Sequence, residues 1–158
     1  MDIDQKQFRE ALGQFVTGIT VITALDQDHL PLGFTANSFN SVSLDPPLVL
    51  WSLARSASTY RDFMAAEKFG VHILAEDQIE LSKRFASTSD NRFQNLEYAL
   101  KDGIPMLNGC LARFECSLEH IYAGGDHSIF VARVQRFDHN SDKQALVYHR
   151  GNYGRLKD

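Results

Sequence analysis

The sequence predicts a mainly β fold, an antiparallel barrel with a few helices at its rim. Short runs rich in Val, Ile, Thr and aromatic residues recur along the chain, and turn-forming residues separate them. The longest run, residues 109–122, alternates apolar and polar side chains as a half-buried strand does. The helical segments between the runs are few, and this favours antiparallel pairing of the strands.

The first element that we expect is a helix over residues 4–15. Phe8, Leu12 and Phe15 recur there at helical spacing and predict one apolar face. Asp4, followed three residues later by Gln7, is typical of a capping box at the helix start.

Three strands are expected next, over residues 18–25, 32–36 and 48–53. The polar turn "DQDHLP" separates the first two. The second and third are separated by a stretch crowded with small hydroxyl and amide residues, which ends at Pro46 and Pro47. This stretch is either a turn-rich connection or a surface that grips a flat polar ligand.

A helix is expected over residues 56–68, capped by Ser56 or Ser58, with Tyr60, Phe63 and Met64 on its apolar side. A short strand over residues 69–74 and a second short helix over residues 76–86 follow.

The rest of the chain reads as an irregular polar stretch and three strands. Residues 87–107 are expected to be irregular. Strands are expected over residues 109–122, 127–137 and 145–156, the first two joined by the turn "AGGD".

Length and composition predict a single domain over residues 1–158. A net charge of -4 argues against a nucleic-acid binder, because no basic excess exists to neutralise phosphates. No apolar run approaches the roughly 20 residues that span a bilayer, and the first residues resemble no signal peptide, so a cytoplasmic protein is expected. Cys110 and Cys116 lie on one predicted strand, too far apart for a disulfide.

Several sequence motifs of common enzyme classes are missing. No GxGxxG follows a strand, no GxxxxGK[ST] loop occurs, and no GxSxG is present. The six histidines show no metal-ligand spacing, so no metal site is expected. Rossmann, NTPase, hydrolase and metalloenzyme functions therefore lose most of their support.

A hydroxyl-rich segment, residues 52–59, leads into the second helix. Backbone N–H groups at a helix start carry partial positive charge and suit a phosphate. Hydroxyls such as those of Ser58 and Thr59, with a cation such as Arg84, would complete such a site. The simpler alternative is that the serines only cap the helix.

The ordered set "FREALGQFVTGITVITA", "GFTANSFNSVSLDPPLVLWSL", "SAST", "LSKRFA" and "GGDHSIFVARV" resembles the short-chain flavin reductases, the reductase components of two-component flavin-dependent monooxygenases. The resemblance covers about residues 8–153. It implies a split Greek-key antiparallel β-barrel (an FMN-binding split barrel), usually a homodimer, that binds FMN or FAD. It also implies hydride transfer from NADH or NADPH to flavin, and release of reduced flavin to a partner oxygenase.

The resemblance also implies roles for individual residues. It implies that Ser58, Thr59, Arg84 and Phe85 contact the phosphate or the ribityl chain, and that His127 and Tyr153 line the nicotinamide side. It implies that the isoalloxazine edge is contacted by two short segments: Thr35, Ala36, Asn37 and Ser38, with Ser52 and Leu53 nearby.

Each role has a structural alternative. His127 follows a turn and fits an exposed turn residue, while Asn37 fits an Asx-type turn. Arg84 fits a solvated helix face, and Tyr153 fits a packing residue.

Two other functions stay open on the sequence. One is a self-contained FMN-dependent oxidase of the pyridoxamine-phosphate oxidase type, which needs a basic substrate pocket that the sequence does not reveal. The other is a non-catalytic flavin-binding protein, which would not need the "GGDH" feature.

Overall fold

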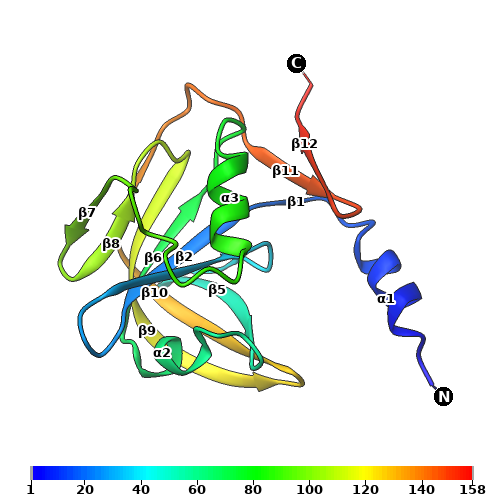
Figure 1. The fold of residues 1–158 in the computed structure, drawn as a ribbon, viewed down its shortest axis with the longest axis horizontal. Helices are drawn as coiled ribbons and strands as arrows, with labels where there is room; N and C mark the ends of the chain where they lie inside the picture. The colour runs from blue at the N-terminus through cyan, green and yellow to red at the C-terminus, as the bar shows by residue number, and fades with distance from the viewer. Residues whose placement is uncertain (1, 158) are drawn as a thin grey trace.

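A computed structural model describes residues 2–157, and its main element is a seven-stranded antiparallel sheet (Figure 1). The sheet curves so strongly that its edge strand β3 contacts β5, which lies next to the opposite edge. The prediction of a mainly β fold with few helices is confirmed. In sheet order the strands are β3 (Pro31–Ala36), β2 (Thr20–Leu25), β6 (Lys68–Ile73), β9 (Ala112–Gly124), β10 (His127–His139), β5 (Pro47–Ala54) and β4 (Asn40–Leu44).

Two small sheets flank the large one, and both correct the sequence prediction. The stretch expected to be irregular contains the hairpin β7 (Tyr98–Lys101) and β8 (Ile104–Leu107). The single strand expected near the C-terminus is the hairpin β11 (Leu146–His149) and β12 (Asn152–Arg155), joined by β1 (Thr17–Gly18). Each hairpin turns on a residue pair with positive φ, Asp102–Gly103 and Arg150–Gly151, which matches the tight turns that join antiparallel strands.

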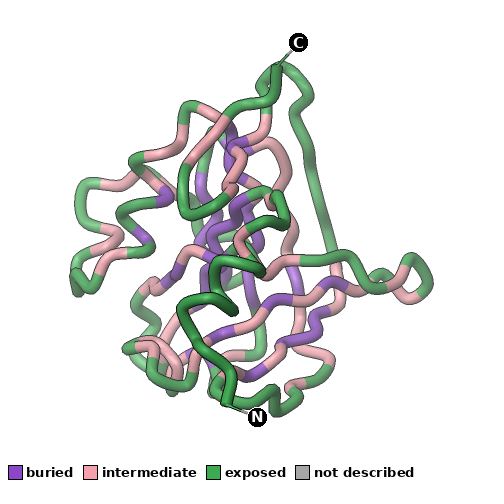
Figure 2. The backbone as a smooth tube through the Cα atoms, turned by 90° about the vertical axis from the view of Figure 1, so that its right-hand side faces the viewer, coloured by how far each residue is buried: buried purple, intermediate pink, exposed green. Residues whose placement is uncertain are grey.

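Helix α1 (Gln5–Leu12) lies apart from the rest of the chain (Figure 1). The side chain of Asp4 caps it, accepting hydrogen bonds from the backbone N–H groups of Lys6 and Gln7. None of its residues is buried (Figure 2), and Phe8 and Leu12 on the predicted apolar face are 51% and 58% exposed. The helical spacing of the apolar residues thus predicted the helix correctly but did not show which surface its apolar face would contact.

Helix α2 (Tyr60–Ala65) starts later than its serines predict. Its N-cap is Thr59, which makes no side-chain capping bond, so the expectation that Ser56 or Ser58 caps it is wrong. Those hydroxyls are not needed for helix formation.

Helix α3 (Ile79–Ala86) packs on β3 through Phe85. A Cβ atom at Gly33 would lie 2.9 Å from the Phe85 ring and 3.0 Å from the Ile22 carbonyl oxygen. Glycine at position 33 therefore lets the helix rest directly on the strand.

The core of the large sheet is aromatic. Trp51 stacks on Phe130 at 5.7 Å, and both meet Phe69 edge-on. Such contacts add to the stabilisation that comes from burying apolar surface. Cys116 packs in this cluster and Cys110 in a separate one; both are free thiols, as expected, and burial raises the pKa of Cys110 to about 11 and that of Cys116 to about 12.

None of the helices within residues 2–157 is long and apolar enough to cross a membrane.

His72 is a fully buried polar link between strands. Its Nδ1 lies 2.9 Å from the carbonyl oxygen of Val21 on β2, and the backbone N–H of Leu107 on β8 donates to Nε2 at 3.0 Å. The first bond requires a proton on Nδ1 and the second a bare Nε2, so the imidazole is neutral. Burial lowers the pKa of His72 to about 4.

Stability should therefore fall as the pH drops below about 6.5, because the unfolded chain then protonates His72 while the folded protein does not. From the pKa of about 4, we expect a loss of about 2 kcal/mol at pH 5 relative to pH 7 from this residue. Urea unfolding at both pH values should show a smaller loss for His72→Gln. Equal losses in the two proteins would refute this role.

Candidate functional site

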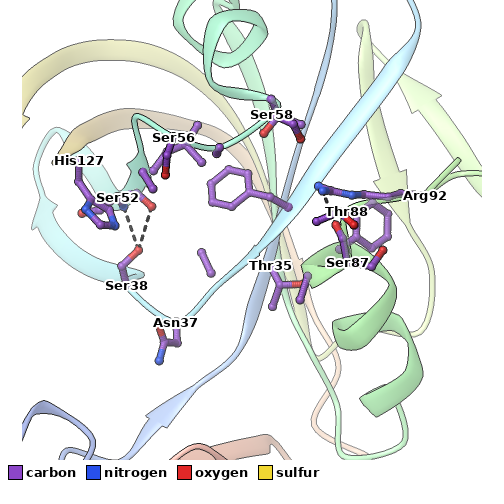
Figure 3. A pocket seen from close by; sticks show the side chains of 18 residues that line it. Thr35, Asn37, Ser38, Ser52, Ser56, Ser58, Ser87, Thr88, Arg92 and His127 are labelled. Atoms are coloured by element: carbon purple, nitrogen blue, oxygen red, sulfur yellow. Dashed lines mark hydrogen bonds between the residues drawn. The ribbon is translucent and has the colours of Figure 1, made fainter. Parts of the chain in front are cut away.

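The main cavity of the described chain has a volume of about 590 Å³ and lies between β3, β5 and α3 (Figure 3). Its volume is within the usual range of small-molecule sites, about 300–1,000 Å³. The lining residues are Phe34, Thr35, Ala36, Asn37, Ser38, Ser52, Leu53, Ala54, Ser56, Ala57, Ser58, Thr59, Phe85, Ala86, Ser87, Thr88, Arg92 and His127.

The structure brings most of the candidate residues to this one cavity. They arrive from the end of β3, the end of β5, the segment before α2, the end of α3 and the start of β10. The candidates that line it are Thr35, Ala36, Asn37, Ser38, Ser52, Leu53, Ser58, Thr59, Phe85 and His127. Two candidates, Arg84 and Tyr153, do not line it.

Arg84 instead supports the segment that follows α3. Its guanidinium donates to the carbonyl oxygen of Gln94 at 2.8 Å and more weakly to that of Arg92 at 3.4 Å. Its side chain therefore holds the backbone of this segment in place.

Tyr153, on β12, lies against α3. Its hydroxyl is 2.9 Å from the Ser82 hydroxyl, and it borders a smaller hollow that shares Thr35 and Asn37 with the main cavity. The backbone carbonyl of Ser82 in turn accepts a 2.6 Å hydrogen bond from the Thr35 hydroxyl. Tyr153 is thus linked to the cavity wall through one intervening residue.

Two serines join the segment that follows β3 to strand β5. The hydroxyl of Ser38 accepts a hydrogen bond from the N–H of Ser52 at 2.9 Å and lies 3.3 Å from its carbonyl oxygen (Figure 3). This pair determines where Asn37 stands, at the same end of the cavity as His127 (Figure 3).

His127 begins β10, directly after the turn that contains Gly125, where φ is 69°. Its Nδ1 is 2.7 Å from a carboxylate oxygen of Asp126, and its side chain is 44% exposed. The hydrogen bond from His127 lowers the pKa of Asp126. The pairing orients the ring and leaves Nε2 available to a ligand.

Arg92 is the functional candidate that the sequence interpretation missed. Its Nη1 donates to the carbonyl oxygen of Gly33 at 2.7 Å, and its Nη2 donates to the carbonyl oxygen of Ser87. Burial lowers the pKa of Arg92, and the carboxylate of Asp90 opposes that shift; an arginine stays charged in either case. One signal was present: Arg92 is the sole Lys or Arg between residues 87 and 100.

The hydroxyls of Ser87 and Thr88, which the sequence did not predict as site residues, lie beside Arg92. Ser58 lies near this end of the cavity too (Figure 3). Among the described lining residues, Arg92 and His127 carry the ionisable side chains. The cavity therefore has a cationic, hydroxyl-rich end and, away from it, an end with Asn37, Ser38, Ser52 and His127 (Figure 3). Such a site suits an elongated ligand with a phosphate at one end and a flat polar ring at the other.

Comparison with known proteins also indicates a protein that binds a flavin nucleotide. The sequence model of the flavin reductase-like domain matches residues 12–157. The chain is 45% identical over 154 residues to "FMN reductase (NADH) SmoA" of Agrobacterium fabrum, covering 97% of this chain and 87% of that protein. It is 43% identical over 149 residues to the reductase component of the flavin-dependent trigonelline monooxygenase of Acinetobacter baylyi, covering 94% of this chain.

Coverage of the relatives differs. The chain spans about half the length of some curated relatives: 48% of the Acinetobacter protein and 48% of a probable flavin reductase of Rhizobium meliloti. Among solved structures, the NADH:FAD oxidoreductase SgcE6 of Streptomyces globisporus, in complex with NAD and FAD fragments, superposes with a TM-score of 0.92 at 34% identity. That match covers 98% of this chain and 93% of SgcE6.

Proposed function

The chain belongs to the flavin reductase-like domain family, and on this premise we propose that it transfers hydride from NADH to a flavin, which then serves a separate monooxygenase. The main support is the cavity, which combines one cationic, hydroxyl-rich end with a second hydrogen-bonding end that holds Asn37, Ser38, Ser52 and His127. The names of its relatives support NADH as donor and a monooxygenase as recipient.

The residues at the two ends fit the two parts of a flavin nucleotide. At one end, the hydroxyls of Ser58 and Thr59 with the guanidinium of Arg92 supply donors for phosphate oxygens. At the other end, the amide of Asn37 and the backbone around Ser52 supply donors and acceptors for a ring edge. The hydroxyl of Thr59 is not used as a helix cap, so it stays available for a ligand.

A bound flavin supplies the hydride acceptor, so the chain needs no nucleophile of its own. The task of the protein is to hold donor and acceptor in a reactive arrangement and to exclude competing geometries. We assign His127 to the nicotinamide side: it stands at the ring end, partly exposed, with its ring fixed by Asp126.

The function is tested by NADH oxidation in the presence and absence of added FMN, FAD or riboflavin. Turnover should require a flavin. His127→Ala should lower kcat/KM for NADH by at least about tenfold because the nicotinamide is less well positioned, with flavin affinity nearly unchanged. His139→Ala, an exposed histidine at the far end of the same strand, is the control. Absence of flavin-dependent NADH oxidation in the unmodified protein would contradict the proposal.

The phosphate assignment is tested by comparing two arginines. Arg92→Gln should weaken binding of FMN about 10- to 100-fold, the effect of losing hydrogen bonds to a charged group, and should barely change binding of riboflavin, which lacks the phosphate. Arg84→Gln should change both affinities by the same factor, because the hydrogen bonds of Arg84 go to backbone carbonyls of residues 92 and 94 and its side chain does not line the cavity. An equal loss for FMN and riboflavin in Arg92→Gln would refute the assignment.

We also propose that the protein forms a homodimer in which a second copy covers the apolar face of α1. That helix has no buried residue, yet Phe8 and Leu12 on the helix and Phe15 after it expose large apolar side chains. Burying this face against another copy would remove apolar surface from water.

Sedimentation velocity tests the dimer. Leu12→Asp should shift the protein towards monomer, because a charge would then lie in the buried contact. Leu100→Asp is a matched control, since Leu12 and Leu100 are each 58% exposed. A monomeric unmodified protein, or an equal response of the two variants, would contradict the interface.

A further inference from the structure

One wall of the main cavity is a short connecting segment. Residues 54–59 lead from the end of β5 to the start of α2, and we call them the connecting wall. All of them except Arg55 line the cavity. Ser58 and Thr59, at the end of the wall, carry the hydroxyls that we assign to the flavin phosphate. The position of this wall relative to the sheet therefore decides where a phosphate can be held.

Backbone hydrogen bonds attach the first part of the connecting wall to the sheet. Ala54 still belongs to β5 and pairs with β10, and the N–H of Arg55 donates to the carbonyl oxygen of Asp126 at 2.9 Å. The next bonds stay within the segment and the helix start: the N–H of Ala57 donates to Ala54, and that of Tyr60 donates to Ala57. These later bonds set the local shape of the wall but not its distance from the sheet.

A pair of hydroxyls attaches the other end of the wall. Tyr60 begins α2 directly after Thr59, and its hydroxyl lies 2.7 Å from the hydroxyl of Ser128. Ser128 directly follows His127 on β10 and is only 3% exposed. A buried hydroxyl that loses its partner costs free energy, so this pairing is favoured over its alternatives. The bond therefore ties the end of the connecting wall to the start of β10.

The core contact of α2 cannot replace this bond. Phe63 is fully buried; its ring meets Phe34 edge-on at 4.9 Å and stacks on Phe69 at 6.1 Å. Burial of apolar surface attaches the helix to the core but has no preferred direction, whereas a hydrogen bond requires a narrow range of distances and angles. Phe63 thus holds α2 in place against the core, and the Tyr60–Ser128 bond fixes its spacing from β10.

This bond connects the two ends of the cavity. Tyr60 is the neighbour of Thr59 at the hydroxyl-rich end, and Ser128 is the neighbour of His127 at the other end (Figure 3). Neither Tyr60 nor Ser128 lines the cavity. Both would therefore act through the residues beside them and not by touching a ligand.

We propose that Tyr60 and Ser128 are positioning residues for the flavin phosphate. Their hydrogen bond sets the spacing between the phosphate-binding hydroxyls at the end of the connecting wall and the start of β10, where His127 stands. The inference rests on the proposed function, since it assumes that a flavin lies in the cavity with its phosphate at Ser58 and Thr59.

The first test compares two substitutions of equal shape. Ser128→Thr keeps the hydroxyl and Ser128→Val lacks it, while both add the same branch to the strand, so steric effects are common to the two variants. Isothermal titration of FMN and riboflavin gives the affinities. FMN should bind about three- to tenfold more weakly to Ser128→Val than to Ser128→Thr, the effect of one lost hydrogen bond. Riboflavin, which lacks the phosphate, should bind the two variants within about twofold of each other.

The second test removes the other hydroxyl. Tyr60→Phe should weaken FMN by a similar factor and leave riboflavin within about twofold of the unmodified protein. Retained riboflavin binding then also shows that the variant is folded. Tyr98→Phe is the matched control, because Tyr98 is a partly buried tyrosine on β7 that does not line the cavity, and it should change neither affinity.

The outcomes separate the inference from the proposed function. Equal losses for FMN and riboflavin in Tyr60→Phe would show a general structural role and overturn the positioning role, as would equal FMN affinities of Ser128→Thr and Ser128→Val. Either result leaves the proposed function standing, because the flavins still bind. If the unmodified protein binds neither flavin, the proposed function is refuted and this inference with it.

Discussion

The candidate site depends on one partly buried interaction, in which Arg92 donates two hydrogen bonds to the backbone carbonyls of Gly33 and Ser87. They hold the segment after α3 against strand β3. Without them, the cationic end of the cavity would lose its wall and its charge together. The same two bonds limit the movement of the guanidinium, so that its position is set before a ligand arrives. Pre-positioned charge lowers the entropy that binding would otherwise cost.

At the opposite end of the cavity, apart from His127, the lining side chains are short and polar. The hydroxyl of Ser38 binds the backbone of Ser52, and the hydroxyl of Thr35 binds the backbone of α3. These short side chains are therefore mainly structural, and they place backbone groups and the Asn37 amide where a flat ring would meet them. Gly33 has two roles, because the absence of its Cβ lets Phe85 lie on β3 and its carbonyl oxygen accepts a hydrogen bond from Arg92. A rigid sheet with short polar side chains thus gives a cavity with two chemically distinct ends.

Sequence patterns predicted much of this protein, and the failures have physical causes. Alternation located the long strands, and the ordered motifs named ten residues that do line the cavity. The β7–β8 hairpin is not predicted although Asp102–Gly103 is a strong turn signal, because the polar residues before it are typical of an irregular segment. Arg92 was passed over for Arg84, since its role depends on a carbonyl 59 residues away in the sequence. The apolar side chains of α1 stay exposed within the described chain, and no periodicity reveals what covers such a face.

The proposed function depends on the orientation of the flavin, with its phosphate at Arg92 and its ring beside Asn37 and His127. A crystal structure of the protein soaked with FMN tests it directly. We expect phosphate oxygens within hydrogen-bond distance of Arg92 and of the Ser58 or Thr59 hydroxyl, with the isoalloxazine against residues 36–38 and 52–53. A flavin bound in the reverse direction, with its phosphate at His127, would refute this orientation, as would a flavin bound outside this cavity.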